Sequence, residues 1–356
     1  MDVSRFEGTE PLLDDGAIDR IRVAAYLKEN IPHCSGDMTI ERFRGGQSNP
    51  TFLIAFENGR RLVLRKKPDG VLLPSAHAVD REFRVLRALE GSDVPVAKAH
   101  LLCDDASLAG AMFYVMDFVE GRSFWDPSLP GLSPRERGQI FGEMRRVMAA
   151  LHVIDFEAAG LSDFGRPGQY IARQVARWSK QYRASETETI PAMDWLIDWL
   201  PENLPADGPP ALLHGDYRLD NLIVHPTEPR VLAVLDWELS TLGDPLADFA
   251  YHMLTWYLPA TPYRGLSDRD FAALGIPDLR RYRTAYFAGV GRDEPSERDW
   301  NVYLAYSLFR VAAIRQGIMR RVSDGTASSP FARAAGALAR PISEMALAFA
   351  ERADRI

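Results

Sequence analysis

The stretch that most constrains the fold of this chain runs from Leu212 to Val224 and reads LLHGDYRLDNLIV. Two apolar residues lead into His-Gly-Asp, and a short polar loop ends at Asn221, directly before an apolar run. A second apolar run, VLAVL at 231–235, is followed at once by Asp236. The pattern predicts a β-hairpin over 222–235 with Asn221 and Asp236 side by side at its open end, because antiparallel pairing brings the two ends together.

The polar side chains beside this hairpin have the chemistry of a metal and base site. The Asp236 carboxylate and the Asn221 amide oxygen are hard ligands that suit Mg²⁺, which completes its shell with phosphate oxygens and water. Asp216 lies one loop upstream and is predicted to accept a proton from an attacking hydroxyl near such a metal-bound phosphate. His-Gly-Asp taken alone also fits an ordinary surface turn, so the prediction depends on the whole spacing.

The composition is that of a globular protein without a basic surface. The chain has 356 residues, of which 46% are hydrophobic and 26% charged, enough for a sizeable core and for two lobes or domains. Its net charge of −7 excludes a general basic surface, so no nucleic-acid partner is expected. The two cysteines, Cys34 and Cys103, lie far apart without metal-ligand spacing and are interpreted as free, buried thiols of a reducing compartment.

Neither the first residues nor any apolar run predicts export or membrane insertion. The chain begins MDVSRFEGTEPLLDD, which is acidic and lacks the basic-then-apolar order of a signal peptide. No apolar run approaches the roughly 20 residues that are needed to span a bilayer. We therefore expect a cytoplasmic protein without a membrane partner.

Hydrophobic periodicity divides the chain into a β-rich first part and a helical second part. Apolar alternation around Asn58-Gly59 predicts a hairpin from the runs at 51–56 and 61–65. From Ser133 a capping box begins a helix with one apolar stripe, and most of the remaining chain is helical. We expect a β-rich lobe at 1–118 and a helical lobe at 119–356. The further predicted elements are helices at 14–31 and 78–89 and strands at 96–103 and 112–119.

The motifs around the hairpin resemble the catalytic and metal-binding loops of protein-kinase-like enzymes, in the version used by aminoglycoside phosphotransferases and choline kinases. His-Gly-Asp at 214–216 stands where protein kinases have His-Arg-Asp, and Asn221 keeps the spacing from catalytic base to metal-binding Asn. Asp-Trp-Glu at 236–238 stands in the place of Asp-Phe-Gly, with Glu238 a candidate second metal ligand or acceptor contact. The resemblance implies an α+β, bilobal protein-kinase-like fold with a small β-rich N-lobe and a larger, mainly helical C-lobe. It also implies ATP and Mg²⁺ as cofactors.

The first lobe contains counterparts of the nucleotide-binding parts of this family. Arg65 stands where the family's phosphate-binding Lys or Arg falls, and Glu82 on the following helix would fix it; an arginine can bridge phosphate oxygens but is not equivalent to a lysine. The segment FYVMDFVEG at 113–121 resembles the hinge, where Met116 would lie behind the adenine. A glycine pair begins a loop that would cover the phosphates, with a plain hairpin turn as the alternative. The predicted nucleotide-binding residues are Gly45, Gly46, Ser48, Asn49, Val63, Arg65, Glu82, Met116, Asp117 and Val119.

Several conspicuous residues are expected to be structural. Lys66 is expected to face solvent, because strand alternation points it away from Arg65. Asp248 is interpreted as an acceptor for the amides of the His-Gly-Asp loop, and His214 as a residue that shapes this loop. Tyr251 could line a substrate pocket, although an aromatic core position is favoured.

Four longer phrases resemble one branch of the family more closely. They are similar to the kinase-like N-terminal domain of acyl-CoA dehydrogenase family members 10 and 11, and they read RGGQSNPTFLI, LVLRKKPDGVLLPSAHAVDREFRVLRAL, DFGRPGQYIARQVARW and LDWELSTLGDPLADFAY. This resemblance implies ATP-dependent phosphorylation of a hydroxyacyl-CoA, with a 4-hydroxyacyl-CoA as the expected acceptor. An acyl-CoA dehydrogenase that acts on the product would then be a separate protein.

The charge distribution also favours an anionic acceptor. Residues 255–356 contain 15 Arg, no Lys and 11 Asp or Glu, a net charge of +4 that suits the phosphates of CoA better than a polycationic aminoglycoside. Arg173, Arg177 and Lys180 form a second candidate acceptor-binding face, although a charge on a helix is usually only solvated.

Three alternatives remain beside this interpretation. The first is an aminoglycoside or other small-alcohol kinase. The second is a nucleotide-binding pseudokinase or scaffold, which has no physical need for an intact base together with both metal residues. The third is a metal-dependent hydrolase, which would normally need more His and carboxylate ligands than this cluster offers.

Overall fold

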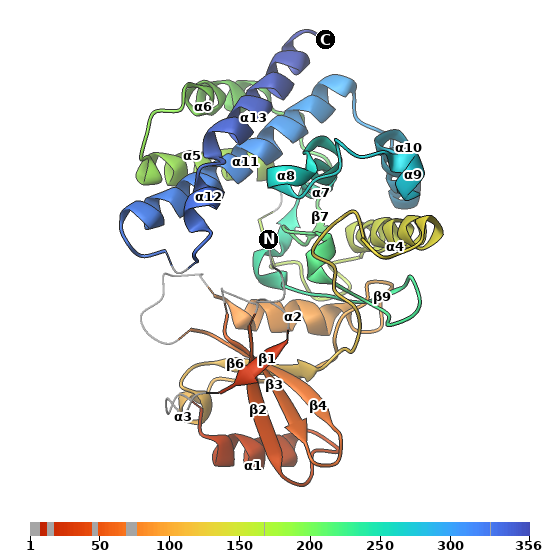
Figure 1. The fold of residues 1–356 in the computed structure, drawn as a ribbon, viewed down its shortest axis with the longest axis vertical. Helices are drawn as coiled ribbons and strands as arrows, with labels where there is room; N and C mark the ends of the chain where they lie inside the picture. Colours follow the sequence, from red (N-terminus) through yellow and green to blue (C-terminus); the bar gives the residue numbers. More distant parts are fainter. Residues whose placement is uncertain (1–7, 13–17, 45–48, 69–76, 167, 328) are drawn as a thin grey trace. The chain divides into compact units, whose positions relative to one another are not determined.

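The computed structural model describes residues 8–12, 18–44, 49–68, 77–166, 168–327 and 329–356 (Figure 1). Backbone contacts divide the chain into two compact units. Unit 1 consists of Met1–Trp125, Glu157–Leu161 and Leu219–Ser240, and unit 2 consists of Asp126–Phe156, Ser162–Arg218 and Thr241–Ile356.

Unit 1 is built on an antiparallel sheet. Its strands are β1 (Thr9–Pro11), β2 (Met38–Phe43), β3 (Thr51–Phe56), β4 (Arg61–Lys66), β5 (Ala99–Cys103) and β6 (Phe113–Asp117). Among the described residues they follow the order β1-β2-β3-β4-β6-β5. β3 and β4 pair from Thr51↔Arg65 to Ala55↔Arg61, so the predicted hairpin at 51–65 is confirmed. β5 and β6 are shorter than the predicted runs.

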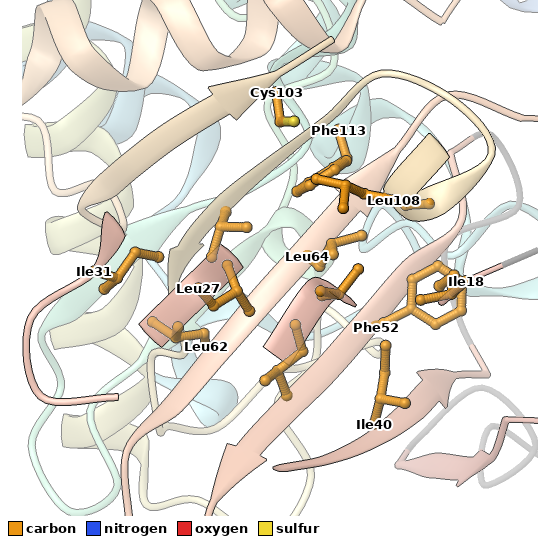
Figure 2. Close-up of a cluster of buried hydrophobic side chains, with 14 of the residues drawn as sticks. Ile18, Leu27, Ile31, Ile40, Phe52, Leu62, Leu64, Cys103, Leu108 and Phe113 are labelled. Atoms are coloured by element: carbon orange, nitrogen blue, oxygen red, sulfur yellow. The ribbon is translucent and has the colours of Figure 1, made fainter. Parts of the chain in front are cut away.

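One face of this sheet forms a hydrophobic core with α1 (Arg20–Asn30) and α3 (Ala106–Ala109), as Figure 2 shows. Strand alternation places Leu62 and Leu64 on this face, and α1 contributes Val23 and Leu27. All four side chains are fully buried. Burying each such side chain stabilises the fold by roughly 1.5–3 kcal/mol, which fixes the strand that also carries Arg65.

Helix α1 begins later than the sequence predicts. The Asp19 carboxylate accepts a hydrogen bond from Arg22 N at 3.0 Å, so Asp19 caps the helix and Arg20 is its first residue. Residues 14–17 of the predicted helix lie outside the described part of the chain. The second predicted helix is confirmed as α2 (Val79–Leu89), which packs against β5 and β6.

Lys66 corrects one expectation about the sheet. Its side chain is 1% exposed, and Lys66 Nζ donates to Ala109 O, the last carbonyl of α3, at 2.8 Å. The prediction that Lys66 faces solvent is therefore wrong. Alternation does point Lys66 away from Arg65, but α1 and α3 cover that face, and a lysine at the end of a helix stabilises its carbonyls.

The hairpin predicted at 222–235 forms a second, smaller sheet of unit 1. β8 (Leu222–Val224) and β9 (Val231–Val234) are antiparallel, with Leu222 opposite Val234. At their open end, Leu235 N donates to Asn221 O at 2.8 Å, which confirms the predicted pairing beside Asp236. Single 3₁₀ turns flank the hairpin, namely η2 (Leu219–Asn221) and η3 (Trp237–Leu239).

Unit 2 is mainly helical. Its helices are α4 (Pro134–His152), α5 (Tyr170–Ser185), α6 (Pro191–Asn203), α7 (Pro245–Tyr257), α8 (Ala260–Tyr263), α9 (Phe271–Leu274), α10 (Leu279–Val290), α11 (Glu297–Ser323), α12 (Ala332–Gly336) and α13 (Ala339–Asp354). β7 (Ala211–Leu213) and β10 (Thr241–Gly243) form a short antiparallel sheet. α4 begins after Ser133, whose hydroxyl accepts from Glu136 N at 3.2 Å, and its predicted apolar stripe between Ile140 and Leu151 is buried.

Helix α11 is the scaffold of unit 2. It packs against α5, α6, α7, α12 and α13 (Figure 1). Between Trp300 and Ala313 most of its side chains are buried, so α11 fixes the helices that surround the His-Gly-Asp loop. No helix in the described ranges is both long and apolar enough to cross a bilayer.

Candidate active site

The α2 face of the unit 1 sheet carries a buried ion pair between Arg65 on β4 and Glu82 on α2. The Arg65 side chain is 11% exposed and the Glu82 side chain 1%. Arg65 Nε lies 2.8 Å from Glu82 Oε2, although its N–H is not aligned for a hydrogen bond. The predicted contact between these two residues is therefore confirmed.

Glu82 is held on its other sides by two neutral donors. Tyr114, which lies opposite Arg65 in the sheet, donates its hydroxyl to Glu82 Oε2 at 3.1 Å. Asn49 Nδ2 donates to Glu82 Oε1 at 2.7 Å. Burial raises the pKa of Glu82, whereas the Arg65 charge and these two donors lower it, and the effect of burial is the larger one. The carboxylate is thus fixed in place by three partners.

Asp236, two residues after the end of β9, is the second partner of Arg65. Arg65 Nη2 donates to Asp236 Oδ1 at 2.7 Å, and Glu238 Oε2 lies 3.9 Å from the same nitrogen. Burial lowers the pKa of Arg65, but the negative charges around it, with Glu82 the largest contributor, raise it above its ordinary value. Arg65 therefore stays charged and joins α2 to the end of the β8–β9 hairpin.

The backbone of Asp236 is in the left-handed region, with φ 64° and ψ 59°. Residues with side chains rarely adopt this conformation, although Asp tolerates it better than most. It costs about 1–3 kcal/mol for an ordinary residue and is often found at functional sites. The contact with Arg65 is made in this conformation.

Asn221 and Asp236 have donor atoms that fit Mg²⁺. Both belong to unit 1 and lie at the open end of the same hairpin. Their amide and carboxylate oxygens are hard ligands, and Mg²⁺ binds few protein groups because it keeps several waters and phosphate oxygens. The Glu238 carboxylate beside Arg65 adds a further oxygen donor of the same kind. The donor set therefore suits the predicted metal.

Four further predicted nucleotide-binding residues lie on or just after β4 and β6. Val63 and Met116 stand directly opposite each other in the sheet. Asp117 N donates to Lys98 O at 2.9 Å. Of the two backbone groups of Asp117, this leaves the carbonyl as the one that would hydrogen-bond to the edge of adenine. Val119 follows β6 and is half-buried. Nucleotide binding by this group stays a prediction.

The predicted phosphate-covering loop is only partly described. Asn49 is fully buried, and its Oδ1 lies 3.0 Å from His77 Nδ1 while its Nδ2 binds Glu82. Its side chain therefore positions Glu82, which leaves the predicted phosphate contact to its backbone amide. The other members of this loop lie outside the described residues, and they are Gly45, Gly46 and Ser48.

In unit 2, the His-Gly-Asp loop after β7 is shaped by Asp248 on α7. The Asp248 carboxylate accepts from His214 N at 2.9 Å and from Gly215 N at 3.0 Å. Gly215 has φ 85°, a conformation that favours glycine. Asp216 N in turn donates to His214 Nδ1 at 3.2 Å. The contacts predicted for Asp248 and His214 are confirmed.

The candidate base Asp216 is held by Tyr251. Tyr251 Oη donates to Asp216 Oδ1 at 2.8 Å. Burial, and then the negative charge of Asp216, raises the pKa of Tyr251 to about 12, so the phenol remains a donor at neutral pH. This bond fixes the position of one carboxylate oxygen of the candidate base. The sequence favoured a core position for Tyr251 and so did not predict this hydrogen bond. Tyr251 lies three residues after Asp248 and shares one face of α7 with it, a spacing that could have indicated the contact with Asp216.

Arg310 on α11 is a further residue that sequence reasoning missed. Its side chain is 7% exposed, and Arg310 Nη2 donates to Gly215 O at 2.7 Å. Its Cζ lies 4.7 Å from the centre of the Tyr251 ring and 5.7 Å from that of Trp178. Arg310 thus supports both the loop and the tyrosine that holds Asp216. It is 95 positions from Gly215, and no local pattern marks it.

The predicted acceptor-binding residues lie on α5. Arg173 donates to the backbone oxygens of Arg166 and Gly168 and so stabilises the turn before the helix. Arg177 and Lys180 are exposed, and Arg177 Cζ lies 5.4 Å from the centre of the Trp178 ring. A role of this group in acceptor binding stays a prediction.

These contacts agree with the family that the sequence resembles. The model of the phosphotransferase enzyme family matches residues 39–289, which is more than half of the chain. The chain belongs to the phosphotransferase enzyme family. The predictions of this family and of a phosphotransferase are therefore confirmed.

Curated relatives of this phosphotransferase carry acyl-CoA dehydrogenase names. Acyl-CoA dehydrogenase family member 10 of Mus musculus is 48% identical over 347 residues, which cover 97% of this chain and 32% of that protein. Family member 11 of Rattus norvegicus is 41% identical over 358 residues, 99% of this chain and 45% of that protein. The chain thus spans between about a third and a half of the length of these relatives. The resemblance to both is confirmed.

Solved structures confirm the predicted fold. A crystal structure from Ralstonia eutropha JMP134, provisionally named an aminoglycoside phosphotransferase, is 52% identical with a TM-score of 0.86 and covers 94% of this chain and 98% of its own. An aminoglycoside phosphotransferase mutant with ADP and hygromycin B shares the fold at 14% identity and a TM-score of 0.59, covering 92% and 98%. The phosphotransferase therefore has the α+β protein-kinase-like fold, with an antiparallel N-terminal sheet and a helical C-terminal part.

Proposed function

We propose that this phosphotransferase transfers the γ-phosphoryl group of ATP to a hydroxyl of a small-molecule acceptor, with Mg²⁺ as cofactor. The contact of Arg65 with both Glu82 and Asp236 carries this proposal. It places a fixed, permanently charged guanidinium beside a candidate metal ligand, and phosphoryl transfer depends on such positioning and charge stabilisation. The relative that holds ADP supports a nucleotide as donor.

Each residue then has a distinct task. Arg65 binds phosphate oxygens of the donor, and Glu82 fixes Arg65. Asn221 and Asp236 hold Mg²⁺, whose charge neutralises phosphate oxygens when it is bound. Asp216 orients the acceptor hydroxyl and takes its proton.

The bonds change as in any phosphoryl transfer to an alcohol. The acceptor oxygen forms a bond to the γ-phosphorus, while the bond between that phosphorus and the β–γ bridging oxygen breaks. ADP leaves with the electron pair of the broken bond. The hydroxyl proton goes to Asp216, whose carboxylate is oriented by the hydrogen bond from Tyr251.

The best candidate acceptor is a hydroxyacyl-CoA of the 4-hydroxyacyl type. Two observations support it. Residues 255–356 carry a net charge of +4 in a chain whose total is −7, which favours an anionic ligand over a cationic antibiotic. The curated relatives are also named after acyl-CoA dehydrogenases. A separate acyl-CoA dehydrogenase that acts on the phosphorylated product completes this proposal.

An ATP-consumption screen of the purified protein tests the proposal. The acceptors are a 4-hydroxyacyl-CoA, the matching acyl-CoA without the hydroxyl, kanamycin and choline. We expect ADP formation with the hydroxyacyl-CoA only, together with a new phosphate-ester signal in ³¹P NMR, and neither with Asp216→Asn.

The name of the Ralstonia relative favours aminoglycosides as a second candidate class. Efficient phosphorylation of kanamycin, with no turnover of any hydroxyacyl-CoA, would overturn the acyl-CoA assignment in favour of that class. Mg-ATP binding without turnover of any acceptor would instead favour a pseudokinase.

A further inference from the structure

A chain of hydrogen bonds connects His77 to the Arg65–Glu82 ion pair of unit 1. His77 Nδ1 lies 3.0 Å from Asn49 Oδ1, and Asn49 Nδ2 donates to Glu82 Oε1 at 2.7 Å. Asn49 is fully buried and Glu82 is 1% exposed, so water has little access to the bond between them. Glu82 Oε2 in turn lies 2.8 Å from Arg65 Nε. Four side chains are thus joined end to end.

The orientation of the Asn49 amide decides whether this chain of contacts holds. A carboxylate only accepts hydrogen bonds, so the Asn49 group that faces Glu82 must be the NH2 donor. The Asn49 oxygen then faces His77, and His77 Nδ1 must carry a proton and donate it to this hydrogen bond. The oxygen and nitrogen of an amide have nearly the same size, so sterics alone do not choose between the two orientations. His77 therefore selects the orientation in which Asn49 donates to Glu82.

A reversed Asn49 amide would disturb the ion pair. It would place Asn49 Oδ1 and Glu82 Oε1 against each other, two acceptors without a proton between them. Burial, the largest effect, raises the pKa of Glu82, whereas the Arg65 charge and the hydrogen bonds from Tyr114 and Asn49 lower it. Losing the Asn49 donor would favour a displaced or protonated Glu82. Arg65 would then lose the carboxylate that fixes it.

The backbone of His77 supports a functional role. His77 has φ 57°, in the left-handed region that residues with side chains rarely adopt. Such conformations persist where the surroundings fix them, and they are frequent at functional sites. The His77 carbonyl accepts from Val79 N at 2.9 Å, at the first residue of α2. This unusual residue therefore lies directly before the helix whose carboxylate it helps to hold.

We propose that His77 is a positioning residue of the nucleotide site. It acts on Arg65 only through Asn49 and Glu82. The inference rests on the proposed function in that Arg65 binds phosphate oxygens of the donor. The task of His77 is to keep one amide oriented, so that Glu82 stays charged and Arg65 stays in place.

Two variants that differ in the group at the Nδ1 position of His77 test this role. His77→Asn places an amide nitrogen at the same distance along the side chain, and asparagine tolerates a left-handed backbone. His77→Leu places a methyl group there, which cannot donate. We expect the affinity for the Mg²⁺ complex of a non-hydrolysable ATP analogue to fall about fivefold in His77→Leu. In His77→Asn it should stay within about twofold of the wild type.

His33 provides the matched control for backbone strain. It is a second histidine of unit 1 in the left-handed region, with φ 64°, but its side chain is exposed and its carbonyl accepts from Asn58 Nδ2. Leucine tolerates this conformation less well than histidine, so both leucine variants should unfold at a lower temperature than the wild type. His33→Leu should nevertheless keep the nucleotide affinity of the wild type. Equal losses of affinity in both leucine variants would assign the effect to the backbone and overturn the proposal.

A double-mutant cycle shows whether His77 acts through the ion pair. If it does, His77→Leu weakens nucleotide binding less in an Arg65→Lys protein than in the wild type, because the residue that it positions is already changed. Losses that add in full would mean that His77 contacts the nucleotide directly or acts by another route, and they would overturn the positioning role. Unchanged affinity in His77→Leu alone would overturn it as well.

The Nε–H signal of Arg65 in ¹H–¹⁵N NMR gives a readout that needs no nucleotide. It should shift or broaden in His77→Leu and keep its wild-type position in His77→Asn. If the wild type binds no Mg-ATP while this signal responds as expected, the proposed function fails and the positioning of Arg65 by His77 stands. An unchanged signal in His77→Leu overturns the positioning role, whatever the protein binds.

Discussion

Arg65 donates to Asp236 across 2.7 Å while its Nε lies 2.8 Å from Glu82. One guanidinium thus contacts two carboxylates from different elements, which the single ammonium of a lysine does not reproduce. We expect Arg65→Lys to weaken binding of the Mg²⁺ complex of a non-hydrolysable ATP analogue by about tenfold in isothermal titration. Arg61→Lys is the matched control, because Arg61 lies on the same strand and pairs with exposed Glu120. Equal losses in both variants would contradict a specific role of Arg65.

Asp236 and Asn221 should differ in their contribution to the metal. Asp236→Asn keeps the side-chain size and the tolerance for a left-handed backbone but removes the charge. We expect it to reduce the Mg²⁺-dependent part of nucleotide affinity more than Asn221→Ala does, because a carboxylate gives the cation a full charge and an amide only a dipole. Titrations of the ATP analogue with and without Mg²⁺ measure this part. Wild-type values in both variants would show that Asp236 and Asn221 do not bind the metal.

Asp216 and Tyr251 should act on turnover and not on donor binding. Asp216→Asn should lower kcat by roughly 10²–10⁴-fold, the usual effect of losing a general base, with affinity for Mg-ATP unchanged. Tyr251→Phe removes the donor to Asp216 Oδ1 and should lower kcat by a smaller factor, about tenfold. Steady-state kinetics and nucleotide titration check both variants. A parallel collapse of nucleotide binding in Asp216→Asn would mean that this residue holds the metal or the fold.

Lys66 should contribute to stability and not to nucleotide binding. In Lys66→Met the carbonyl of Ala109 loses the donor that lies 2.8 Å away in a buried place. We expect the free energy of unfolding to fall by about 1–3 kcal/mol in urea titrations. Nucleotide affinity of the folded variant should equal that of the wild type. Strongly reduced affinity would show that the adjacent Arg65 is not the only cation of β4 that serves the nucleotide.

His252 should make stability depend on pH. Its Nδ1 donates to Tyr217 O at 3.2 Å and its Nε2 accepts from the Tyr282 hydroxyl at 2.8 Å. Burial lowers the pKa of His252 to about 4, against about 6.5 in an unfolded chain. The unfolded state therefore binds the proton first as pH falls. Neutral His252 contributes fully to the free energy of unfolding above about pH 6.5. This contribution is lost progressively as the pH falls to about 4, by up to about 3 kcal/mol.

Urea unfolding at a series of pH values between 7 and 4 measures this loss. His252→Gln removes the titrating group and should flatten the pH dependence in that window, whatever its effect at neutral pH. The same slope in the variant and the wild type would assign the loss to other groups.

Local patterns in the sequence were sufficient to predict most elements that position the site. β3 and β8 have the predicted bounds, and α4 begins after the predicted Ser133 cap, because strand alternation and capping are properties of neighbouring residues. The pairing of Arg65 with Glu82 followed from the family resemblance, since strand periodicity alone does not specify which helix residue lies opposite.

The contacts that the sequence did not predict depend on which element covers a given face. Strand alternation assigned Lys66 to the face opposite Arg65, but it could not show that α3 supplies a carbonyl there. Tyr251 has the periodicity of a core residue, and its bond to Asp216 appears only once the His-Gly-Asp loop is folded onto α7. Arg310 looks like an ordinary helix charge until the packing of α11 buries it.

Residues 219–240 belong to unit 1 although the sequence places them between two segments of unit 2. The position of a crossover between the genes of two relatives would therefore decide whether the parts of unit 1 stay together. A single crossover between residues 126 and 218 would take the six-stranded sheet from one parent and the β8–β9 hairpin from the other, so that Arg65 and Asp236 would have different ancestries. A single crossover after residue 240 instead replaces helices α7–α13 of unit 2 and keeps these two residues together, and exchanges of that kind are the ones we expect lineages with new acceptors to retain.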